Sequence, residues 1–210
     1  MRNEHGCSLA LYTRRTMPRH REFNTDQALE SAMHAFWKHG YEATSLTDLM
    51  EAMGLQKGSI YKAFSDKHSL FIATLKRYLD EAHRFDTTTI DKAISPKESI
   101  SLWLKNGMKN ICGQSLKRGC LIVNVLTERG SQDEEVSNLV KEHYAETLKL
   151  LTKTIEEGQV KNEFRKDLIA SEQAQLILVS LIGMLVLTKG PISESESLQN
   201  IKNVMKLIER

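Results

Sequence analysis

The chain has 210 residues, of which 40% are hydrophobic and 27% are charged, and its formal net charge is +2. These values are ordinary for a soluble globular protein that buries a core without disulfides or metals. The net charge is too small to identify a nucleic-acid binder by itself. Three widely spaced cysteines form no disulfide framework, which favours the reducing cytoplasm. No stretch reaches the roughly 18 apolar residues of a membrane span, so we expect no membrane partner.

Residues 1–22 are predicted to be a flexible basic N-terminal arm. The basic cluster consists of Arg14, Arg15, Arg19 and Arg21. Such a cluster is typical of a solvated tail; the alternative is an arm that contacts phosphates or lies in a minor groove. Met17 is an alternative translation start, and the sequence does not distinguish it from Met1.

Three helices are predicted next. Apolar residues at 3.6-residue spacing indicate a helix from about Thr25 to His39, which a glycine ends. Two short helical patterns follow, at about 45–53 and 56–64. Gly54, between them, can adopt the left-handed conformation of a sharp turn. Thr44 is the expected N-cap of the first short helix, whereas Gln56 is a poor cap for the second.

The second short helix has an outer face with no acidic residue. That face carries Gln56, Lys57, Ser59, Tyr61 and Lys62. Polar, basic and aromatic groups of this kind form hydrogen bonds with base edges and phosphates. Two helices joined by a glycine-containing turn make a helix-turn-helix, whose second helix enters the major groove of DNA.

This stretch resembles the N-terminal DNA-binding domain of the TetR/AcrR family of bacterial transcription regulators. The matching residues are Phe36, Gly40, Tyr41, Thr44, Ser45, Leu49, Gly54, Gly58, Ser59, Ile60, Tyr61, Phe64, Lys67, Leu70 and Phe71. The match is close over about residues 24–75. The resemblance implies an all-α fold with a three-helix helix-turn-helix domain at 23–83, its motif at about 45–64, and a helical effector-binding and dimerisation domain at 84–210.

The DNA-binding residues expected from the sequence fall into two groups. Gln56, Lys57 and Ser59 are assigned to base edges. The phosphate contacts are assigned to Thr44, Ser45, Tyr61, Lys62 and Lys67. For Lys67 the alternative is a solvated surface lysine.

The second half of the chain is predicted to be helical, without strands. Its helices are expected at 67–85, from Pro96 to near Gly113, and at 119–128, 131–158, 169–187 and 194–208. Residues 86–89 look like a helix end or loop. Ser131 is read as the start of a capping box, and Asp167 or Ser171 as the residue that opens the next helix.

An effector pocket is expected among the middle helices. Its candidate residues are Trp103, Met108, Cys112, Cys120, Asn124 and Tyr144, although each also suits a plain core. Asn124 suits a structural hydrogen bond. Glu128 is either a solvated charge near the helix end or part of a motif with Cys120 and Asn124 that resembles one in a subset of the family's effector domains. Cys120 is either a buried thiol or, because Lys117 and Arg118 precede it, a reactive thiolate that senses electrophiles or oxidants.

The sequence therefore predicts a transcription regulator rather than an enzyme. No histidine pair, nucleophile elbow or phosphate loop occurs, so we expect no catalytic residue, metal or cofactor. By the resemblance, a homodimer joined through about 131–158 and 169–189 binds a palindromic operator in double-stranded DNA, and a small molecule releases this repressor. An activator, or a helical adaptor without DNA binding, are the alternatives. The effector, the operator and the regulated genes are not identified.

Overall fold

A computed structural model describes residues 24–112, 118–190 and 192–210 of the protein. Within these residues the chain forms nine helices, and Phe164 and Glu209 form an isolated bridge instead of a sheet. The helices are α1 (Thr25–His39), α2 (Leu46–Met53), α3 (Lys57–Phe64), α4 (Lys67–Asp91), α5 (Pro96–Cys112), α6 (Leu121–Arg129), α7 (Glu134–Val160), α8 (Ala170–Leu187) and α9 (Glu194–Ile208). The predicted all-α class is confirmed. The predicted arm at 1–22 lies outside the described residues.

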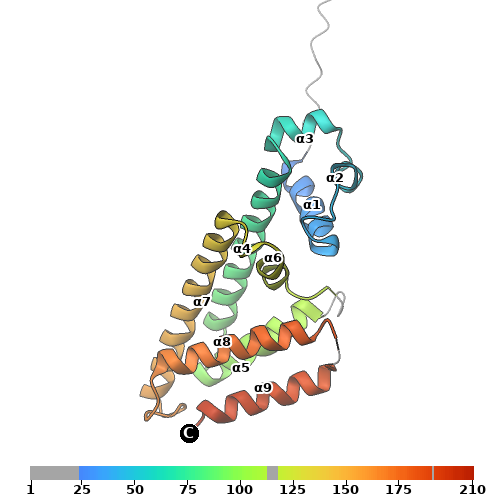
Figure 1. Ribbon diagram of the computed structural model, residues 1–210. Helices are drawn as coiled ribbons and strands as arrows, with labels where there is room; N and C mark the ends of the chain where they lie inside the picture. Colours follow the sequence, from blue (N-terminus) through green and yellow to red (C-terminus); the bar gives the residue numbers. More distant parts are fainter. Residues whose placement is uncertain (1–23, 113–117, 191) are drawn as a thin grey trace, which may run out of the picture.

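Helices α1 and α3 pack against α4 at one end of the molecule, and α2 packs against α1 and α3 (Figure 1). Their shared core contains the fully buried Phe36, Leu49, Ile60 and Phe71. The rings of Phe36 and Phe71 pack edge to face, with centroids 5.1 Å apart. The apolar spacing in the sequence thus produces a small closed core, which fixes α3 on the outside of the molecule.

Helix α4 is longer than the sequence predicted, because it continues through residues 86–89 to Asp91. Asp86 is buried there, where it accepts hydrogen bonds from Trp103 of α5 and Thr147 of α7. The Thr87 hydroxyl donates to the carbonyl of His83 one turn earlier, a bond that suits a helix interior. The predicted loop is therefore wrong, and one continuous helix crosses the expected domain boundary at 83/84.

Three predicted helix starts are also corrected. Ser45, not Thr44, caps α2, in a reciprocal capping box with Asp48. Asp133, not Ser131, caps α7 by accepting a hydrogen bond from the Val136 amide. Helix α8 begins after Ile169, whose side chain makes no capping hydrogen bond.

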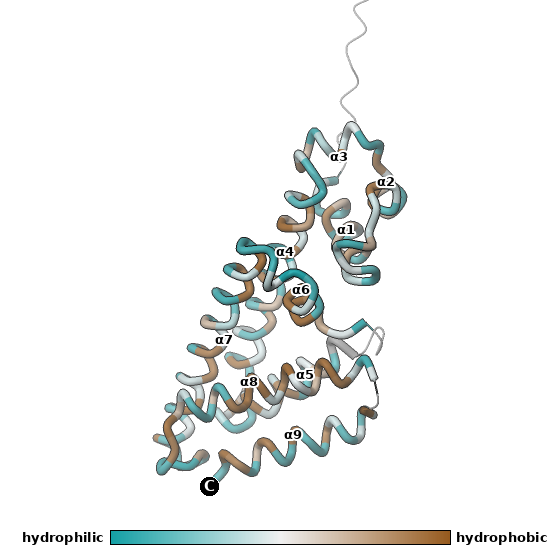
Figure 2. The backbone as a smooth tube through the Cα atoms, viewed as in Figure 1, coloured by the Kyte–Doolittle hydropathy of each residue, from teal (hydrophilic) through white to brown (hydrophobic). Residues whose placement is uncertain are grey.

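The remaining helices build the larger half of the molecule, in which α7 and α8 pack extensively against each other (Figure 1). Helix α8 is the most hydrophobic of the described helices, and Figure 2 shows the long brown stretches along it. It is long and apolar enough to cross a membrane, but buried core helices pass the same test and 44% of it is buried. Its outward side chains therefore need another explanation.

Helix α6 lies between two hydrophobic cores. Leu121 and Val125 pack into the core of α1–α4, whereas Cys120, just before the helix, belongs to the core of α5 and α7–α9. Ile122 packs against both. One short helix is therefore in direct contact with both halves of the protein.

Candidate functional site

The turn between α2 and α3 is well defined. Gly54 ends α2 with φ +63° and ψ +26°, the left-handed conformation that the sequence predicts. The amide of Leu55 then donates to the carbonyl of Met50, which closes the end of the helix. Gln56 precedes α3 and makes no side-chain capping hydrogen bond, as expected from its side chain. The helix-turn-helix geometry is thus present, with an uncapped second helix.

The outer face of α3 exposes most of the residues that the sequence assigned to DNA. Gln56, Lys57, Tyr61 and Lys62 are exposed, and Ser59 is partly exposed. The Lys57 ammonium lies 5.6 Å from the centroid of the Tyr61 ring, so these two side chains form one basic and aromatic surface. Such a surface matches the groups that proteins use to contact bases and phosphates.

Thr44 does not belong to this surface. Its side chain is fully buried, and its hydroxyl donates to the carbonyl of Gly40 at 2.5 Å. A buried, paired hydroxyl has no surface to offer a phosphate, so the predicted phosphate contact through this side chain is wrong. Ser45 is exposed, although its hydroxyl already bonds to Asp48.

Lys67 lies at the start of α4 and is only partly exposed. Its ammonium is 4.4 Å from the centroid of the Tyr41 ring and 3.5 Å from the carbonyl oxygen of Glu42. It therefore helps to hold the turn between α1 and α2, and it remains a prediction as a phosphate contact.

Helices α1 and α4–α8 enclose a cavity of about 620 Å³. Three of the predicted pocket residues, Trp103, Cys120 and Tyr144, line it, together with Val123 and Leu126 of α6. The volume is in the range of small-molecule sites. The predicted effector pocket thus has a physical counterpart.

The other predicted pocket residues lie elsewhere or are undescribed. Met108 is buried in the core and does not line the cavity. Asn124 faces away from it and donates a hydrogen bond to the Arg118 carbonyl at 2.9 Å, which is the structural role considered from the sequence. The Cys112 side chain lies outside the part of the chain that the structure describes.

One wall of the cavity is polar, which we did not predict from the sequence. Asp86 and His143 both line the cavity. Burial raises the pKa of the Asp86 carboxyl, against the opposing hydrogen bonds from Trp103 and Thr147. Burial lowers the pKa of His143, although the nearby Asp86 opposes this shift. This wall therefore places two titratable groups with shifted pKa values beside the cavity.

Cys120 is a buried thiol in this structure. Burial raises the pKa of its thiol, and the Tyr78 hydroxyl lies 3.9 Å from its sulfur. A raised pKa is the opposite of the shift that makes a cysteine reactive. The geometry therefore favours the first of the two interpretations made from the sequence.

Glu128, near the end of α6, binds the turn that precedes α2. Its two carboxylate oxygens accept hydrogen bonds from the backbone amides of Tyr41 and Glu42, at 3.0 and 2.9 Å. Gly40 is part of this fit: its φ is +83°, and a Cβ there would lie 2.9 Å from the carboxylate. Of the two alternatives for Glu128, the solvated charge is therefore wrong, because its carboxylate accepts hydrogen bonds from two amides 87 and 86 positions away.

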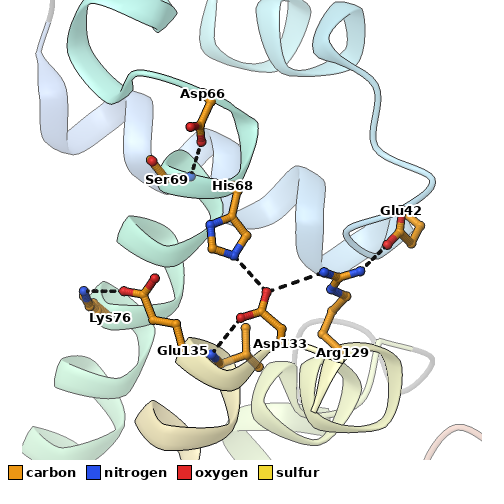
Figure 3. Close-up of polar contacts among 9 residues, drawn as sticks. Glu42, Asp66, His68, Ser69, Lys76, Arg129, Asp133 and Glu135 are labelled. Carbon is orange, nitrogen blue, oxygen red and sulfur yellow. Dashed lines mark hydrogen bonds and ion pairs between the residues drawn. The ribbon is translucent and has the colours of Figure 1, made fainter. Parts of the chain in front are cut away.

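Arg129 extends the same contact (Figure 3). Its guanidinium forms ion pairs with Glu42 in the turn and with Asp133 before α7, and it lies 4.8 Å from the centre of the Tyr41 ring. Asp133 also pairs with His68 of α4 at 2.8 Å. Although burial raises it, the pKa of Asp133 is lowered overall by hydrogen bonds from His68, Val136 and Arg129. We call Glu128, Arg129 and their partners in residues 41–42 the turn latch.

The other end of α6 is also tied to α1. The indole nitrogen of Trp37 donates to the carbonyl of Gly119 at 3.0 Å, and the Arg118 guanidinium lies 4.8 Å from the Trp37 ring. Both ends of α6 therefore contact the helix-turn-helix half, while its middle lines the cavity. Within the described residues, no cluster of metal-binding side chains occurs.

Comparison with known proteins identifies two domains. Residues 28–74 match the family model of bacterial regulatory proteins of the tetR family. Residues 102–190 match the model of a tetracyclin repressor-like C-terminal domain. Both matches fall in the halves that the sequence and the fold distinguish.

Individual relatives agree with these models. The HTH-type transcriptional repressor ComR of Escherichia coli is 26% identical over 88% of this chain and 89% of its own. The uncharacterized HTH-type regulator YezE of Bacillus subtilis is 30% identical over 58% of this chain and 62% of its own. The solved structure of a cysteine mutant of the TetR family regulator CifR, complexed with 26-base-pair operator DNA, is 28% identical with a TM-score of 0.80, covering 91% of this chain and 100% of that one.

Proposed function

The chain belongs to the TetR family of bacterial regulatory proteins, and from this premise we propose that it is a repressor released from its operator by a ligand in the cavity of α1 and α4–α8. The supporting observation is the position of α6, which lines this cavity and carries the turn latch at its end. The protein is a DNA-binding transcription regulator, which excludes the adaptor without DNA binding. That the protein represses transcription, and does not activate it, is part of the proposal and rests on its similarity to the repressor ComR.

For DNA, we propose contacts from the exposed face of α3 and its neighbours. Gln56, Lys57 and Ser59 contact base edges in the major groove, because they begin the helix and point outward. The proposed phosphate contacts are Ser45, Tyr61, Lys62 and Lys67. The mutant CifR structure with operator DNA supports this use of the domain.

The protein acts as a dimer, and we propose that α8 supplies the centre of its interface. The outward side chains of α8 are apolar and between 44% and 53% exposed: Leu176, Val179, Val186 and Leu187. A contiguous apolar surface of this kind favours a protein partner. The expected second helix, at 131–158, exposes charged residues such as Lys149, Lys153 and Glu156. Helix α9, with Leu198 42% exposed, fits better beside α8.

The proposed release mechanism uses two states of α6. In one state the turn latch holds residues 41–42, and with them the orientation of α2 and α3 relative to α4. A ligand that contacts Val123 and Leu126 favours a shifted α6, and the latch then holds the turn in another position. Operator affinity falls by the ratio of the ligand affinities for the two states.

A thiol-based response is a second candidate, because Cys120 lines the cavity. The similar CifR structure is that of a variant with substituted cysteines. An electrophile that enters the cavity would react with the ionised form of this thiol, and burial disfavours that form. Release of wild-type protein from DNA by N-ethylmaleimide, and its loss in Cys120→Ser, would support this candidate; equal release of both proteins would remove it.

The proposed function is tested by titrating the protein against a labelled DNA fragment from upstream of its own gene. Fluorescence anisotropy at 50 to 200 mM salt should show specific binding whose affinity falls steeply with salt, since phosphate contacts release counterions. A scrambled fragment of equal length is the control. Equal affinity for both fragments would contradict operator recognition.

A further inference from the structure

The cavity has a marked charge composition. Three carboxylates line it, those of Glu30, Glu81 and Asp86, and no lysine or arginine does so among the described residues. Arg77, outside the lining, pairs with Glu30 at 3.9 Å and with Glu81 at 3.2 Å, so Asp86 is the lining carboxylate that has no lysine or arginine partner in the described part of the chain. Burial lowers the pKa of His143, so this histidine of the lining adds little positive charge. The Asp86 carboxylate would repel an anionic ligand, whereas it would attract a cation.

Asp86 is the deepest of these carboxylates. It is 7% exposed, and its oxygens accept hydrogen bonds from the Trp103 indole at 2.7 Å and the Thr147 hydroxyl at 3.1 Å. Each carboxylate oxygen has two lone pairs, so both keep acceptor capacity after these bonds. The two donors also fix the carboxylate on three helices, α4, α5 and α7. A rigid, buried carboxylate at a cavity wall is a preformed partner for a positive group.

Aromatic rings make up much of the remaining wall. They are Trp37, Tyr78, Phe85, Trp103 and Tyr144. The faces of such rings attract organic cations, most strongly where water is excluded. Rings and a carboxylate together therefore favour a cation with apolar substituents over a hydrated metal ion.

We propose that the effector of this protein is a lipophilic organic cation, such as a quaternary ammonium compound, whose charged nitrogen lies against Asp86 among the aromatic rings. This inference rests on the proposed function, because it names the ligand class of the same cavity. The apolar part of the ligand contacts Val123 and Leu126, which places it on α6. The Asp86 charge thus determines which ligands bind, and the apolar contact shifts α6, which carries the turn latch.

A matched set of three probes tests the charge alone. Benzyltrimethylammonium, neopentylbenzene and benzylsulfonate have nearly the same shape and carry a positive, no and a negative charge. Calorimetric titration of the full-length protein without DNA should give at least tenfold tighter binding of the cation than of the neutral probe, and no binding of the anion. Equal or tighter binding of the neutral probe or the anion overturns the proposal, as does no binding of the cation at millimolar concentration.

Variants locate the charge that matters. Asp86→Asn should lower the affinity for benzyltrimethylammonium at least tenfold and leave that for neopentylbenzene within twofold. Glu142→Gln, which removes an exposed carboxylate of α7 outside the cavity, is the matched control and should change neither. If Asp86→Asn does not fold, Glu81→Gln should still weaken the cation selectively. Equal cation affinity in wild type and the folded cavity variant overturns the proposal.

Release from DNA is measured separately. Benzyltrimethylammonium should weaken binding to the upstream fragment in the anisotropy assay, and benzylsulfonate should not. Cation binding without any effect on DNA would contradict the proposed function while the ligand class stands. DNA release by benzylsulfonate but not by the cation would overturn the ligand class and leave the proposed function intact.

Discussion

The two halves of this protein differ in how their interiors are packed. Around α1–α3 the core is closed, with Phe36, Leu49 and Ile60 at most 2% exposed, and the chemistry lies on the outer face of α3. In the other half, α4–α8 leave a cavity of about 620 Å³ that α1 closes on one side, and the chemistry faces inward. A closed core transmits a displacement as a rigid body, whereas a hollow one changes with its occupant. Helix α6 contacts both halves, so we expect it to transmit ligand binding in the cavity to the helix-turn-helix.

The largest expected effect is on the outer face of α3. The double variant Lys57→Glu with Lys62→Glu should lower affinity for the upstream fragment about 10³-fold, or about 4 kcal/mol, because four reversed charges per dimer repel phosphates. Anisotropy titrations measure it. Lys141→Glu on the exposed face of α7 is the control. Similar losses in both variants would mean that net charge, rather than this face, determines binding.

Alanine substitutions at two glycines distinguish the effect of the turn latch from that of backbone strain alone. Gly40→Ala should destabilise the protein by about 2–3 kcal/mol, since its φ of +83° and ψ of 170° suit only glycine and its Cβ would meet the Glu128 carboxylate. Gly54→Ala, where the space is open, should cost about 1 kcal/mol. Urea unfolding gives both values. Equal costs would show that Glu128 moves aside freely.

The partly buried His143 gives the cavity half a pH dependence. Its folded pKa is depressed below 6.5, so its contribution to stability is present above pH 6.5 and is lost as the pH falls through the folded pKa. The groups facing it are Asp86, Glu146 and His83. Asp86, with a raised pKa, gives the opposite slope at lower pH.

The free energy of unfolding should therefore decrease as the pH is lowered from 7.5 to 5.5. In the His143→Gln variant it should decrease less steeply. Urea titrations at each pH give the two curves. Parallel curves would contradict the assigned shift.

The smallest expected effect is at the start of α3. Gln56→Ser should stabilise the protein by about 0.5–1 kcal/mol, because serine supplies the missing cap. The same change should weaken operator binding if Gln56 contacts a base. Thermal unfolding and anisotropy measure the two effects. Greater stability with unchanged DNA affinity would remove Gln56 from the proposed base contacts.

The sequence predicted the closed half well, because short-range patterns determine it. The left-handed Gly54, the uncapped Gln56 and the apolar spacing of α1 each depend on residues within a few positions. Thr44 was misassigned because its partner, the Gly40 carbonyl, becomes available only when the turn folds inward.

The hollow half was predicted less completely, because its key contacts join distant residues. Asp86 looked like part of a loop, and only Trp103 and Thr147 explain its burial. Glu128 looked solvated, although its partners lie in the turn before α2. The helical pattern at 119–128 placed Asn124 and Glu128 in one helix, but it did not show that Asn124 bonds to Arg118 or that Glu128 reaches the turn before α2.

The coupling of the two halves through Glu128 is tested most directly by measuring operator affinity in Glu128→Gln. A glutamine keeps one acceptor for the Tyr41 and Glu42 amides and places an NH₂ group against the other, so half of the turn latch is lost. We predict at least fivefold weaker binding to the upstream fragment, with no change for Glu135→Gln, which loses only an exposed ion pair with Lys76. Unchanged affinity in a folded Glu128→Gln protein would contradict the account.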